Sequence, residues 1–439
     1  MKKIHIKTWG CQMNEYDSSI IFHVLQKKLK YIATKNAEKS DLIILNTCSI
    51  REKAQEKLFD QLGRWKKLKH INKKLIIAVG GCVAAQEKKN IYKRAPYVDI
   101  IFGPKTIHRL PKIIKKIYKK RKKIINIQSN SLKKYKFYKH HSLKKISEYI
   151  SIMEGCNKCC SFCIVPHTRG KEISRNPEEI LSEANFLANN GTKEIILLGQ
   201  NVNSYKGKSI NKSILKLSNL IKLISKIDQI KRIRFITSNP MEFTDDLIKI
   251  YKKVPKLVSY LHLPVQSGSN RILKKMRRAY NISIYKKIIQ KLILYRPNIQ
   301  ITSDFIIGFP GETREDFQKT LKLIDEIKFD MSFSFIYSKR PGTPAARLLD
   351  SVSLQEKKER LYFLQKKIQK NTKFWSKKMI GTRQKVLVEK FIYKNNIKKL
   401  FGKTQNNRTV LFKGSKKLIG KIINVKIKNA HMQTLKGEL

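Results

Sequence analysis

Apolar and polar positions alternate in blocks along the first part of the chain. Strand-like apolar runs occupy residues 2–11, 41–48, 73–82 and 98–104, and amphipathic stretches separate them. Such an alternation of strand and helix patterns is typical of α/β units. It predicts an α/β domain with an open parallel sheet over residues 1–117.

The same alternation returns over residues 147–375, with longer helical stretches such as 177–191 and 314–329. Strands that are joined by helices at this spacing run parallel, with right-handed crossovers. The pattern predicts a full or partial βα barrel as the central domain. Its expected strands lie at 148–153, 193–199, 232–237, 257–266, 299–309 and 331–338.

The remaining two segments differ from these domains. Residues 118–146 are basic and poorly periodic, which indicates a linker or an inserted basic segment. Residues 376–439 contain short alternating strands at 384–390, 408–414 and 418–430, with turn residues between them. This pattern predicts a small β-barrel. Its interleaved lysines are typical of barrels that bind RNA, and a purely structural cap is the alternative.

Composition narrows the class of protein. The formal charge of +63 favours a polyanionic partner, although lysines are scattered over the whole chain and not all of them need one. The start lacks the apolar stretch of an exported leader, and seven cysteines do not suggest a secreted disulfide framework. No apolar run approaches the ~18 residues of a membrane span. We therefore expect a cytoplasmic protein without membrane contact.

Three cysteines, Cys156, Cys160 and Cys163, stand in a C-x₃-C-x₂-C run directly after the first strand of the central domain. Thiolates suit iron–sulfur clusters, and three of them can hold three irons of a [4Fe–4S] cube. The fourth iron then has no protein ligand and can bind a substrate. The position predicts a cluster at the carboxyl end of the barrel, where βα loops carry the chemistry.

Zinc is the alternative metal for this run, because Cys159 creates two consecutive C-x₂-C pairs that could act as its ligands. Neighbouring residues of an extended chain point to opposite sides, so Cys159 and Cys160 would not readily face one tetrahedral metal. Zinc ribbons also separate their cysteine pairs by a dozen or more residues. The three-cysteine cluster is therefore favoured, with Cys159 as a bystander.

Three further cysteines, Cys11, Cys48 and Cys82, each end one of the strand-like runs of the first domain. Residues just past the carboxyl ends of parallel strands line one crevice, where ligands bind. We expect these cysteines to converge and to form a second metal site. The alternative is that the three cysteines are buried or bind no metal, since free cysteine packs well as a small hydrophobic residue.

Eight motifs now give the chain a resemblance that covers nearly its whole length. They are TWGCQMNEYDS, NTCSIREKAQEK, VGGC, MEGCNK, PHTRGKEISR, LGQNVNSY, HLPVQSGSN and DFIIGFPGET. The chain resembles the radical S-adenosylmethionine methylthiotransferases, with an N-terminal cluster domain, a radical core and a TRAM-like barrel. NTCSIREKAQEK is most similar to the branch that acts on tRNA.

The resemblance implies two [4Fe–4S] clusters and S-adenosylmethionine. The cofactor would chelate the open iron of the Cys156/Cys160/Cys163 cluster and be cleaved to a 5′-deoxyadenosyl radical. That radical would abstract hydrogen from carbon 2 of a dimethylallyl-modified adenosine at position 37, in the anticodon loop. Sulfur, methylated by a second S-adenosylmethionine, would come from an auxiliary cluster on Cys11, Cys48 and Cys82.

The resemblance also suggests residues that contact the cofactor. Many radical enzymes hold the methionine amine with Gly-Gly-Glu at the end of the second strand, where this chain has Gly199-Gln200-Asn201. An amide supplies no charge, so its contribution should be smaller. Ser238 and Gln266 lie at later strand ends and could contact ribose or adenine. Stabilising a loop is the alternative role for both.

Two arginines follow the cysteine run. Arg169 and Arg175 could reach a phosphate or a cofactor carboxylate, and an ordinary surface position is the alternative.

Partners and competing functions follow from the same resemblance. It implies tRNA, a flavodoxin- or ferredoxin-like electron donor and iron–sulfur assembly proteins as partners, and we expect a monomer. Other branches of the family would modify threonylcarbamoyl-adenosine in tRNA or an aspartate of a ribosomal protein. A non-catalytic iron–sulfur or zinc RNA-binding protein is the alternative of another class, but it leaves two sets of three cysteines unexplained.

Overall fold

The computed structural model describes residues 1–48, 52–120, 122–127, 145–394 and 397–439. It divides into two compact units. The N-terminal unit holds the described residues of Met1–Leu143 together with Glu154–Lys158 and Ile164–Ile173. The core unit holds the described residues of Lys144–Met153, Cys159–Cys163 and Ser174–Leu439.

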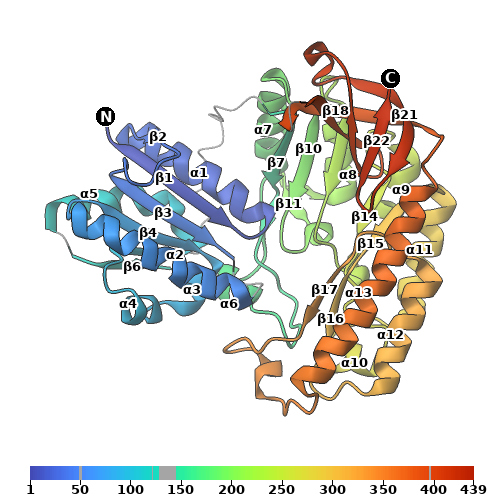
Figure 1. Cartoon of the computed structure of the whole chain (residues 1–439), viewed down its shortest axis with the longest axis horizontal. Coiled ribbons are helices and arrows are strands. Elements are labelled where there is room, and N and C mark those ends of the chain that lie inside the picture. Colours follow the sequence, from blue (N-terminus) through green and yellow to red (C-terminus); the bar gives the residue numbers. More distant parts are fainter. Residues whose placement is uncertain (49–51, 121, 128–144, 395–396) are drawn as a thin grey trace. The chain divides into compact units, whose positions relative to one another are not determined.

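A parallel six-stranded sheet forms the centre of the N-terminal unit, in the order β2-β1-β3-β4-β5-β6 (Figure 1). Its strands are β1 (Lys3–Trp9), β2 (Ile32–Ala33), β3 (Leu42–Thr47), β4 (Ile76–Gly81), β5 (Ile100–Phe102) and β6 (Ile124–Asn126). Its helices are α1 (Gln12–Leu29), α2 (Glu52–Ile71), α3 (Cys82–Glu87), α4 (Asn90–Arg94), α5 (Leu110–Lys120) and α6 (Val165–Arg169), with a 3-10 turn η1 at Pro104–Arg109. The open parallel α/β sheet expected from the sequence is confirmed.

Helices cover both faces of this sheet. Alternate strand residues such as Ile43 and Val79 pack against Leu62 and Trp65 of α2 in one buried cluster. On the other face, α1 contacts β1 and β3 and packs beside α5. Because both faces are buried, β3 and β4 are apolar along nearly their whole length, as central parallel strands require.

The predicted linker of residues 118–146 differs from the structure at its start. Its first residues complete α5, and β6 pairs in parallel with β5, with Ile124 opposite Ile100. Two isoleucines and an edge position are enough to add a short strand, although three residues are too few to show periodicity in the sequence. Residues 128–144 of the predicted linker lie outside the described residues.

The core unit begins with parallel strands joined by helices. Strands β13-β10-β7 form one sheet, β14 pairs with β15, β16 pairs with β17, and all of these pairs are parallel. The strands are β7 (Ser147–Ser151), β10 (Glu194–Leu198), β13 (Arg232–Phe235), β14 (Tyr260–His262), β15 (Gln300–Thr302), β16 (Asp304–Ile307) and β17 (Phe333–Ile336). Single parallel bridges, Ile233 to Leu257 and Gln266 to Phe305, continue the series. The expected partial βα barrel is confirmed.

Helices and short strands complete this barrel. The helices are α7 (Pro177–Asn189), α8 (Leu217–Ser225), α9 (Asp245–Lys253), α10 (Asn270–Lys275), α11 (Ile282–Tyr295), α12 (Arg314–Ile327) and α13 (Leu354–Lys377). Two-stranded pairs are formed by β8 (Met153–Glu154) with β9 (Ile173–Ser174) and by β11 (Lys206–Lys208) with β12 (Ile214–Lys216). One large apolar cluster fills the space between the strands and the helices.

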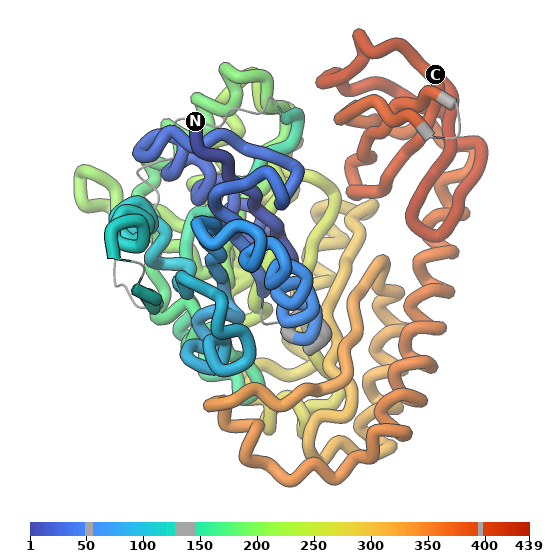
Figure 2. The backbone as a smooth tube through the Cα atoms, turned by 60° about the vertical axis from the view of Figure 1, so that its left-hand side comes forward, coloured from blue at the N-terminus to red at the C-terminus, as the bar shows by residue number. Residues whose placement is uncertain are grey.

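A closed five-stranded barrel ends the core unit, in the order β18-β19-β20-β22-β21. Its strands are β18 (Arg383–Lys394), β19 (Ile397–Thr404), β20 (Thr409–Phe412), β21 (Ile422–Ala430) and β22 (Thr434–Glu438). The chain enters it directly from the long helix α13 (Figure 2). The predicted small C-terminal β-barrel is confirmed. Among the described residues, no helix is both long and apolar enough to span a membrane.

A buried ion pair fastens this barrel to the rest of the core unit. Arg408 Nη2 lies 2.7 Å from Asp330 Oδ1, and neither side chain is exposed to solvent. Arg408 Nη1 also donates to the carbonyl of Met432 at 3.1 Å. Removing one partner of a buried pair leaves the other charge uncompensated.

We therefore expect Arg408→Met to lower the free energy of unfolding by about 3–5 kcal/mol, measured by urea denaturation. The matched control is Lys367→Met, which breaks a pair with Asp325 whose side chains are 32% and 55% exposed. Exposed pairs contribute about 1 kcal/mol or less. Equal losses for the two variants would contradict the role assigned to the buried pair.

Candidate functional site

The three N-terminal cysteines lie at one edge of the N-terminal sheet. Trp9 is paired with Thr47, and Thr47 is paired with Gly81, so the carboxyl ends of three strands are level. Cys48 follows β3 directly, Cys82 is the first residue of α3, and Cys11 is the N-cap residue of α1. The parallel register thus brings together three thiols that are far apart in the sequence.

Gly10 shows how closely these strand ends approach one another. Its φ is +130°, and a Cβ atom at this position would lie 2.4 Å from Cys48 Cβ. Only glycine fits such a conformation and such a contact. The glycine of TWGC therefore allows Cys11 to turn toward Cys48.

The three thiols form one hydrogen-bonded group in which Cys48 is central. Contacts with Cys48 lower the pKa of Cys11 from 9.0 to about 7 and that of Cys82 to about 6, although burial acts in the opposite direction. The same two contacts, together with burial, raise the pKa of Cys48 well above 9.0. Thiolates are the form that binds metals, so the pocket already favours the ligand form of two of the cysteines.

A buried arginine stabilises the negative charge of this group. Arg169 is 2% exposed, and its Nε donates to Cys82 Sγ at 3.4 Å. Its other nitrogens donate to Asp17 Oδ2 at 2.8 Å and to Glu154 Oε1 at 2.7 Å. Burial lowers the pKa of Arg169, but attraction to Cys82 and to both carboxylates outweighs it, and the pKa lies well above its ordinary value.

Two buried asparagines hold the backbone and the thiol of the first turn of α1. Cys11 Sγ donates to Asn14 Oδ1 at 3.2 Å. Asn46 Nδ2 donates to the Asn14 carbonyl at 2.9 Å, which joins the end of β3 to α1. Asn46 Nδ2 also donates to Ser18 Oγ at 2.9 Å, so these buried side chains tie the first turn of α1, next to Cys11, to the end of β3.

Three cysteine thiols are a donor set that an iron–sulfur cluster can use. Within the described ranges, no three thiol, imidazole or carboxylate side chains are placed around one common metal position. The N-terminal thiols contact each other instead. A cubane cluster attaches each thiolate to a different iron, so it requires three separate sulfur donors. The three thiols with a buried arginine beside them satisfy that requirement.

The C-x₃-C-x₂-C run is divided between the two units. Gly155 and Cys156 belong to the N-terminal unit. Gly155 has a φ of +83°, and a Cβ atom there would lie 2.1 Å from the Lys171 carbonyl oxygen. The Cys156 N–H donates to the Gly170 carbonyl at 3.2 Å. The segment that follows the cysteine run therefore supports the segment that precedes it.

Cys160 and Cys163 belong to the core unit, where they form a tight turn. The Cys163 N–H donates to the Cys160 carbonyl at 3.1 Å. Cys160 is buried and Cys163 is half-buried, whereas Cys159 is exposed. Arg278 Nη1 donates to Cys160 Sγ at 3.4 Å. That Cys159 is a bystander and that Cys156, Cys160 and Cys163 are the ligands stays a prediction.

Four of the six residues expected to contact the cofactor lie at the carboxyl ends of β10 and β13. Asn203 Nδ2 donates to the Asn239 carbonyl at 2.6 Å, and the Asn239 N–H donates to Asn203 Oδ1 at 2.9 Å. These bonds hold the two strand ends side by side. Gly199, Gln200 and Asn201 follow β10 directly, and Ser238 lies on the strand end that β13 contributes.

Two buried polar atoms at these strand ends are available to a ligand. Asn201 Nδ2 is bound to Glu242, but neither Asn201 Oδ1 nor Ser238 Oγ has a hydrogen-bond partner among the described residues. Buried polar atoms are nearly always satisfied, so such a pair indicates a ligand or ordered water. Gln266 is also buried, and its backbone, at a φ of +73°, bridges β16 through Asp304 and Ile306.

Both arginines that follow the cysteine run are buried, which rules out the surface position considered for them. Arg175 is 1% exposed and pairs with Glu183 at 2.8 Å, a structural role within the core unit. Arg169 contacts Cys82, one of the three N-terminal cysteines. Its expected contact with a cofactor carboxylate stays a prediction, since Asp17 and Glu154 already bind two of its nitrogens.

Several residues of the site were not recognised from the sequence. They are Asn14, Asp17, Asn46, Glu154 and Arg278. The first three share a signal: each is a polar residue within the motifs TWGCQMNEYDS or NTC, on an element that is otherwise buried. Glu154 carries the same signal, because it lies in the motif MEGCNK on a buried strand, whereas Arg278 carries none, because its partner Cys160 is distant in sequence.

Comparisons with known proteins agree with this arrangement. Family models match residues 3–103 (Uncharacterized protein family UPF0004), residues 150–324 (Radical SAM superfamily) and residues 377–439 (TRAM domain). A solved radical S-adenosylmethionine methyltransferase, TsrM from Kitasatospora setae, is similar in fold with a TM-score of 0.54 at 12% identity, over 79% of this chain and 75% of that one.

Curated relatives match the chain from end to end. The tRNA-2-methylthio-N(6)-dimethylallyladenosine synthase of Buchnera aphidicola subsp. Acyrthosiphon pisum (strain APS) is 60% identical over 100% of both chains. The protein of the same name from Mannheimia succiniciproducens is 52% identical over 100% of this chain and 92% of its own. The chain therefore belongs to the family of tRNA-2-methylthio-N(6)-dimethylallyladenosine synthases, within the radical SAM superfamily.

Proposed function

We propose that this protein attaches a methylthio group to carbon 2 of N6-(dimethylallyl)adenosine at position 37 of tRNA. The observation that carries this proposal is the identity of 52–60% to synthases of that name along the whole chain. The convergence of Cys11, Cys48 and Cys82 supports it, because sulfur insertion needs a sulfur donor beside the radical chemistry. The function is therefore that of a tRNA methylthiotransferase.

The N-terminal thiols would hold an auxiliary [4Fe–4S] cluster. Cys11 and Cys82 favour the thiolate form, and Arg169 offsets the negative charge that three thiolates bring into a buried site. The Asn14 backbone N–H donates to the Cys11 sulfur and lowers its pKa, a contact that the thiolate keeps. Three cysteines rather than four leave one iron for an external ligand.

Cys156, Cys160 and Cys163 would hold the second [4Fe–4S] cluster. With S-adenosylmethionine, such a cluster supplies the one-electron cleavage that starts radical hydrogen abstraction. Asn201 Oδ1 and Ser238 Oγ are buried acceptors that would orient the cofactor. The carboxyl ends of the strands place these groups on the side of the barrel where βα loops carry chemistry.

The C-terminal barrel would bind the tRNA backbone. It contains two acidic residues, Glu389 and Glu438. Its exposed lysines surround the barrel surface, namely Lys385, Lys390, Lys398, Lys413, Lys416, Lys417, Lys421, Lys426, Lys428 and Lys436. Lysines that neutralise phosphates release counterions, so binding should weaken steeply with salt.

The proposal retains the domain division 1–117, 118–146, 147–375 and 376–439, except that the end of α5 and β6 belong to the first domain, and it takes the last domain as the RNA-binding part. It also retains a flavodoxin- or ferredoxin-like donor, since the cleavage consumes an electron, and iron–sulfur assembly proteins as the source of the clusters. We propose the cytoplasm as its location, because its substrate is tRNA. We propose that it acts as a monomer.

The test is methylthiolation of defined tRNAs by the anaerobically reconstituted protein. We expect nucleoside mass spectrometry to detect the 2-methylthio product when the tRNA carries N6-(dimethylallyl)adenosine, together with S-adenosylmethionine and a reductant. The same tRNA without the dimethylallyl group is the matched control. If the methylthio product formed only on a tRNA with threonylcarbamoyl-adenosine, or only on an aspartate of a ribosomal protein, the proposed substrate would be wrong.

A further inference from the structure

The loop that carries Cys160 is fastened to the end of helix α10. The Ser161 N–H donates to the Met276 carbonyl at 3.0 Å, and Ser161 Oγ donates to the Lys275 carbonyl at 2.8 Å. Phe162 packs against an apolar cluster that includes Ile272 and Met276 of the same helix end. The position of Cys160 is therefore set by the residues that end α10.

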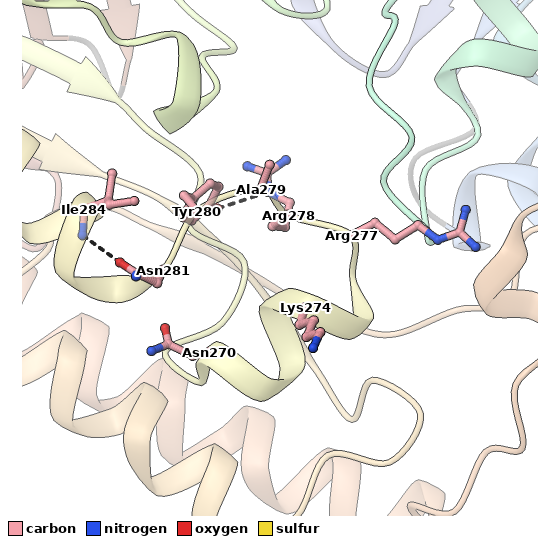
Figure 3. A pocket seen from close by; sticks show the side chains of 8 residues that line it. All are labelled: Asn270, Lys274, Arg277, Arg278, Ala279, Tyr280, Asn281 and Ile284. Atoms are coloured by element: carbon pink, nitrogen blue, oxygen red, sulfur yellow. Dashed lines mark hydrogen bonds between the residues drawn. The ribbon is translucent and has the colours of Figure 1, made fainter.

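Those residues also direct Arg278 toward the sulfur. The chain leaves α10 through Arg277, which has a φ of +54°, and the Arg278 N–H donates back to the Leu273 carbonyl at 2.9 Å. This turn separates the two neighbouring side chains, and Figure 3 shows Arg277 extending away from Arg278. Arg278 is thus held close to Cys160 by the same helix end that fixes the cysteine loop.

All three nitrogens of the Arg278 guanidinium donate to different acceptors. Nη1 donates to Cys160 Sγ at 3.4 Å, Nη2 to the Pro264 carbonyl at 3.1 Å, and Nε to Tyr280 Oη at 3.0 Å. Tyr280 Oη in turn donates to the Val265 carbonyl at 2.9 Å. The planar fork of arginine matches acceptors that lie in three directions, and lysine cannot reproduce it.

Arg278 also lines an open basic pocket of about 470 Å³ (Figure 3). Lys274 and Arg277 line the same pocket. Each of the three cations adds one positive charge to this surface, but the hydrogen bond to Cys160 belongs to Arg278. Arg277 is therefore a useful control. Its removal takes one positive charge from the pocket but leaves the hydrogen bond between Arg278 and Cys160 in place.

We propose that Arg278 is a positioning residue of the radical-generating cluster, and that its N–H···S bond to Cys160 raises the reduction potential of that cluster. Reduction adds one electron, and part of its charge resides on the sulfur ligands. A charge-assisted hydrogen bond to such a sulfur is stronger in the reduced form. The inference rests on the proposed function, because it takes Cys160 as a cluster ligand.

The test is a potentiometric titration followed by electron paramagnetic resonance. It uses the full chain with Cys11, Cys48 and Cys82 replaced by alanine, so that only the radical-generating cluster titrates. At a fixed potential we expect Arg278→Gln to lower the ratio of reduced to oxidised cluster about tenfold, which is about 59 mV for one electron. Arg277→Gln, the matched control, should leave that ratio nearly unchanged.

A conservative variant separates positioning from folding. Arg278→Lys keeps the charge but offers one donor group to three acceptors, so we expect a smaller shift in the same direction. Iron content and circular dichroism of each variant show whether the cluster and the fold are intact. If Arg278→Gln does not fold, the test is the reduction potential of the cluster in Arg278→Lys compared with that in Arg277→Gln.

Three outcomes would overturn the inference. They are an unchanged potential in Arg278→Gln, equal shifts in Arg278→Gln and Arg277→Gln, and loss of the cluster from both Arg278 variants, which would make Arg278 a requirement for cluster binding. Failure of the cluster assignment looks different, because the parent protein with Arg278 intact would then contain no redox-active iron at all. A different substrate would leave the cluster and its potential unchanged.

Discussion

Replacing Cys156, Cys160 and Cys163 together with alanine is expected to abolish the formation of 5′-deoxyadenosine from S-adenosylmethionine. The loss should exceed roughly a thousandfold, because the three cysteines act as one unit in holding the cluster through which the donor's electron would reach S-adenosylmethionine. The measurement is chromatographic detection of 5′-deoxyadenosine under reducing conditions. Methylthiolation of tRNA should disappear with it.

Cys159→Ala is the matched control for this variant. Cys159 lies within the same loop but is exposed, and zinc binding through two C-x₂-C pairs would require it. We expect Cys159→Ala to retain cofactor cleavage. Loss of cleavage in Cys159→Ala, or its persistence in the triple variant, would contradict the assignment of the three ligands.

The second large effect is expected at the other end of the chain. Replacing Cys11, Cys48 and Cys82 with alanine should leave 5′-deoxyadenosine formation within about twofold of the parent protein, while the 2-methylthio product on tRNA falls to background. The physical reason is the separation of roles: these thiols contact each other and Arg169, whereas Cys156, Cys160 and Cys163 form a separate set within one short loop.

The single variants Cys11→Ala, Cys48→Ala and Cys82→Ala test the same separation one ligand at a time. Cys48 is the most informative, because it contacts both of the others. Full methylthiolation by any of these variants would rule out an auxiliary cluster on the three thiols. Loss of cofactor cleavage together with sulfur insertion would show instead that the N-terminal unit supports the fold of the radical site.

The convergence of Cys11, Cys48 and Cys82 could be predicted from the sequence because a parallel sheet levels the ends of its strands. Each cysteine follows an apolar run, and the observed register places Trp9, Thr47 and Gly81 side by side. The closed C-terminal barrel could be predicted for a similar reason: its alternating strands are short and separated by turn residues. Both predictions depend on local patterns that repeat.

Contacts between distant residues could not be predicted in this way. Arg169 follows the cysteine run of the central domain in sequence, yet its guanidinium binds Cys82 and Asp17 of the N-terminal unit. Arg278 reaches Cys160 across more than a hundred residues of chain. A single sequence shows that these arginines exist, but their partners are set by tertiary packing. Strand β6 was missed because three residues at a sheet edge show no periodicity.

The central claim is that the chain holds two clusters on two separate sets of three cysteines. Its most direct test is the iron and sulfide content of the anaerobically reconstituted protein, beside the variant with Cys156, Cys160 and Cys163 replaced by alanine. We predict about eight irons per chain in the wild type and about four in the variant. About four irons falling to none would contradict the claim, since the N-terminal cysteines would then hold no cluster.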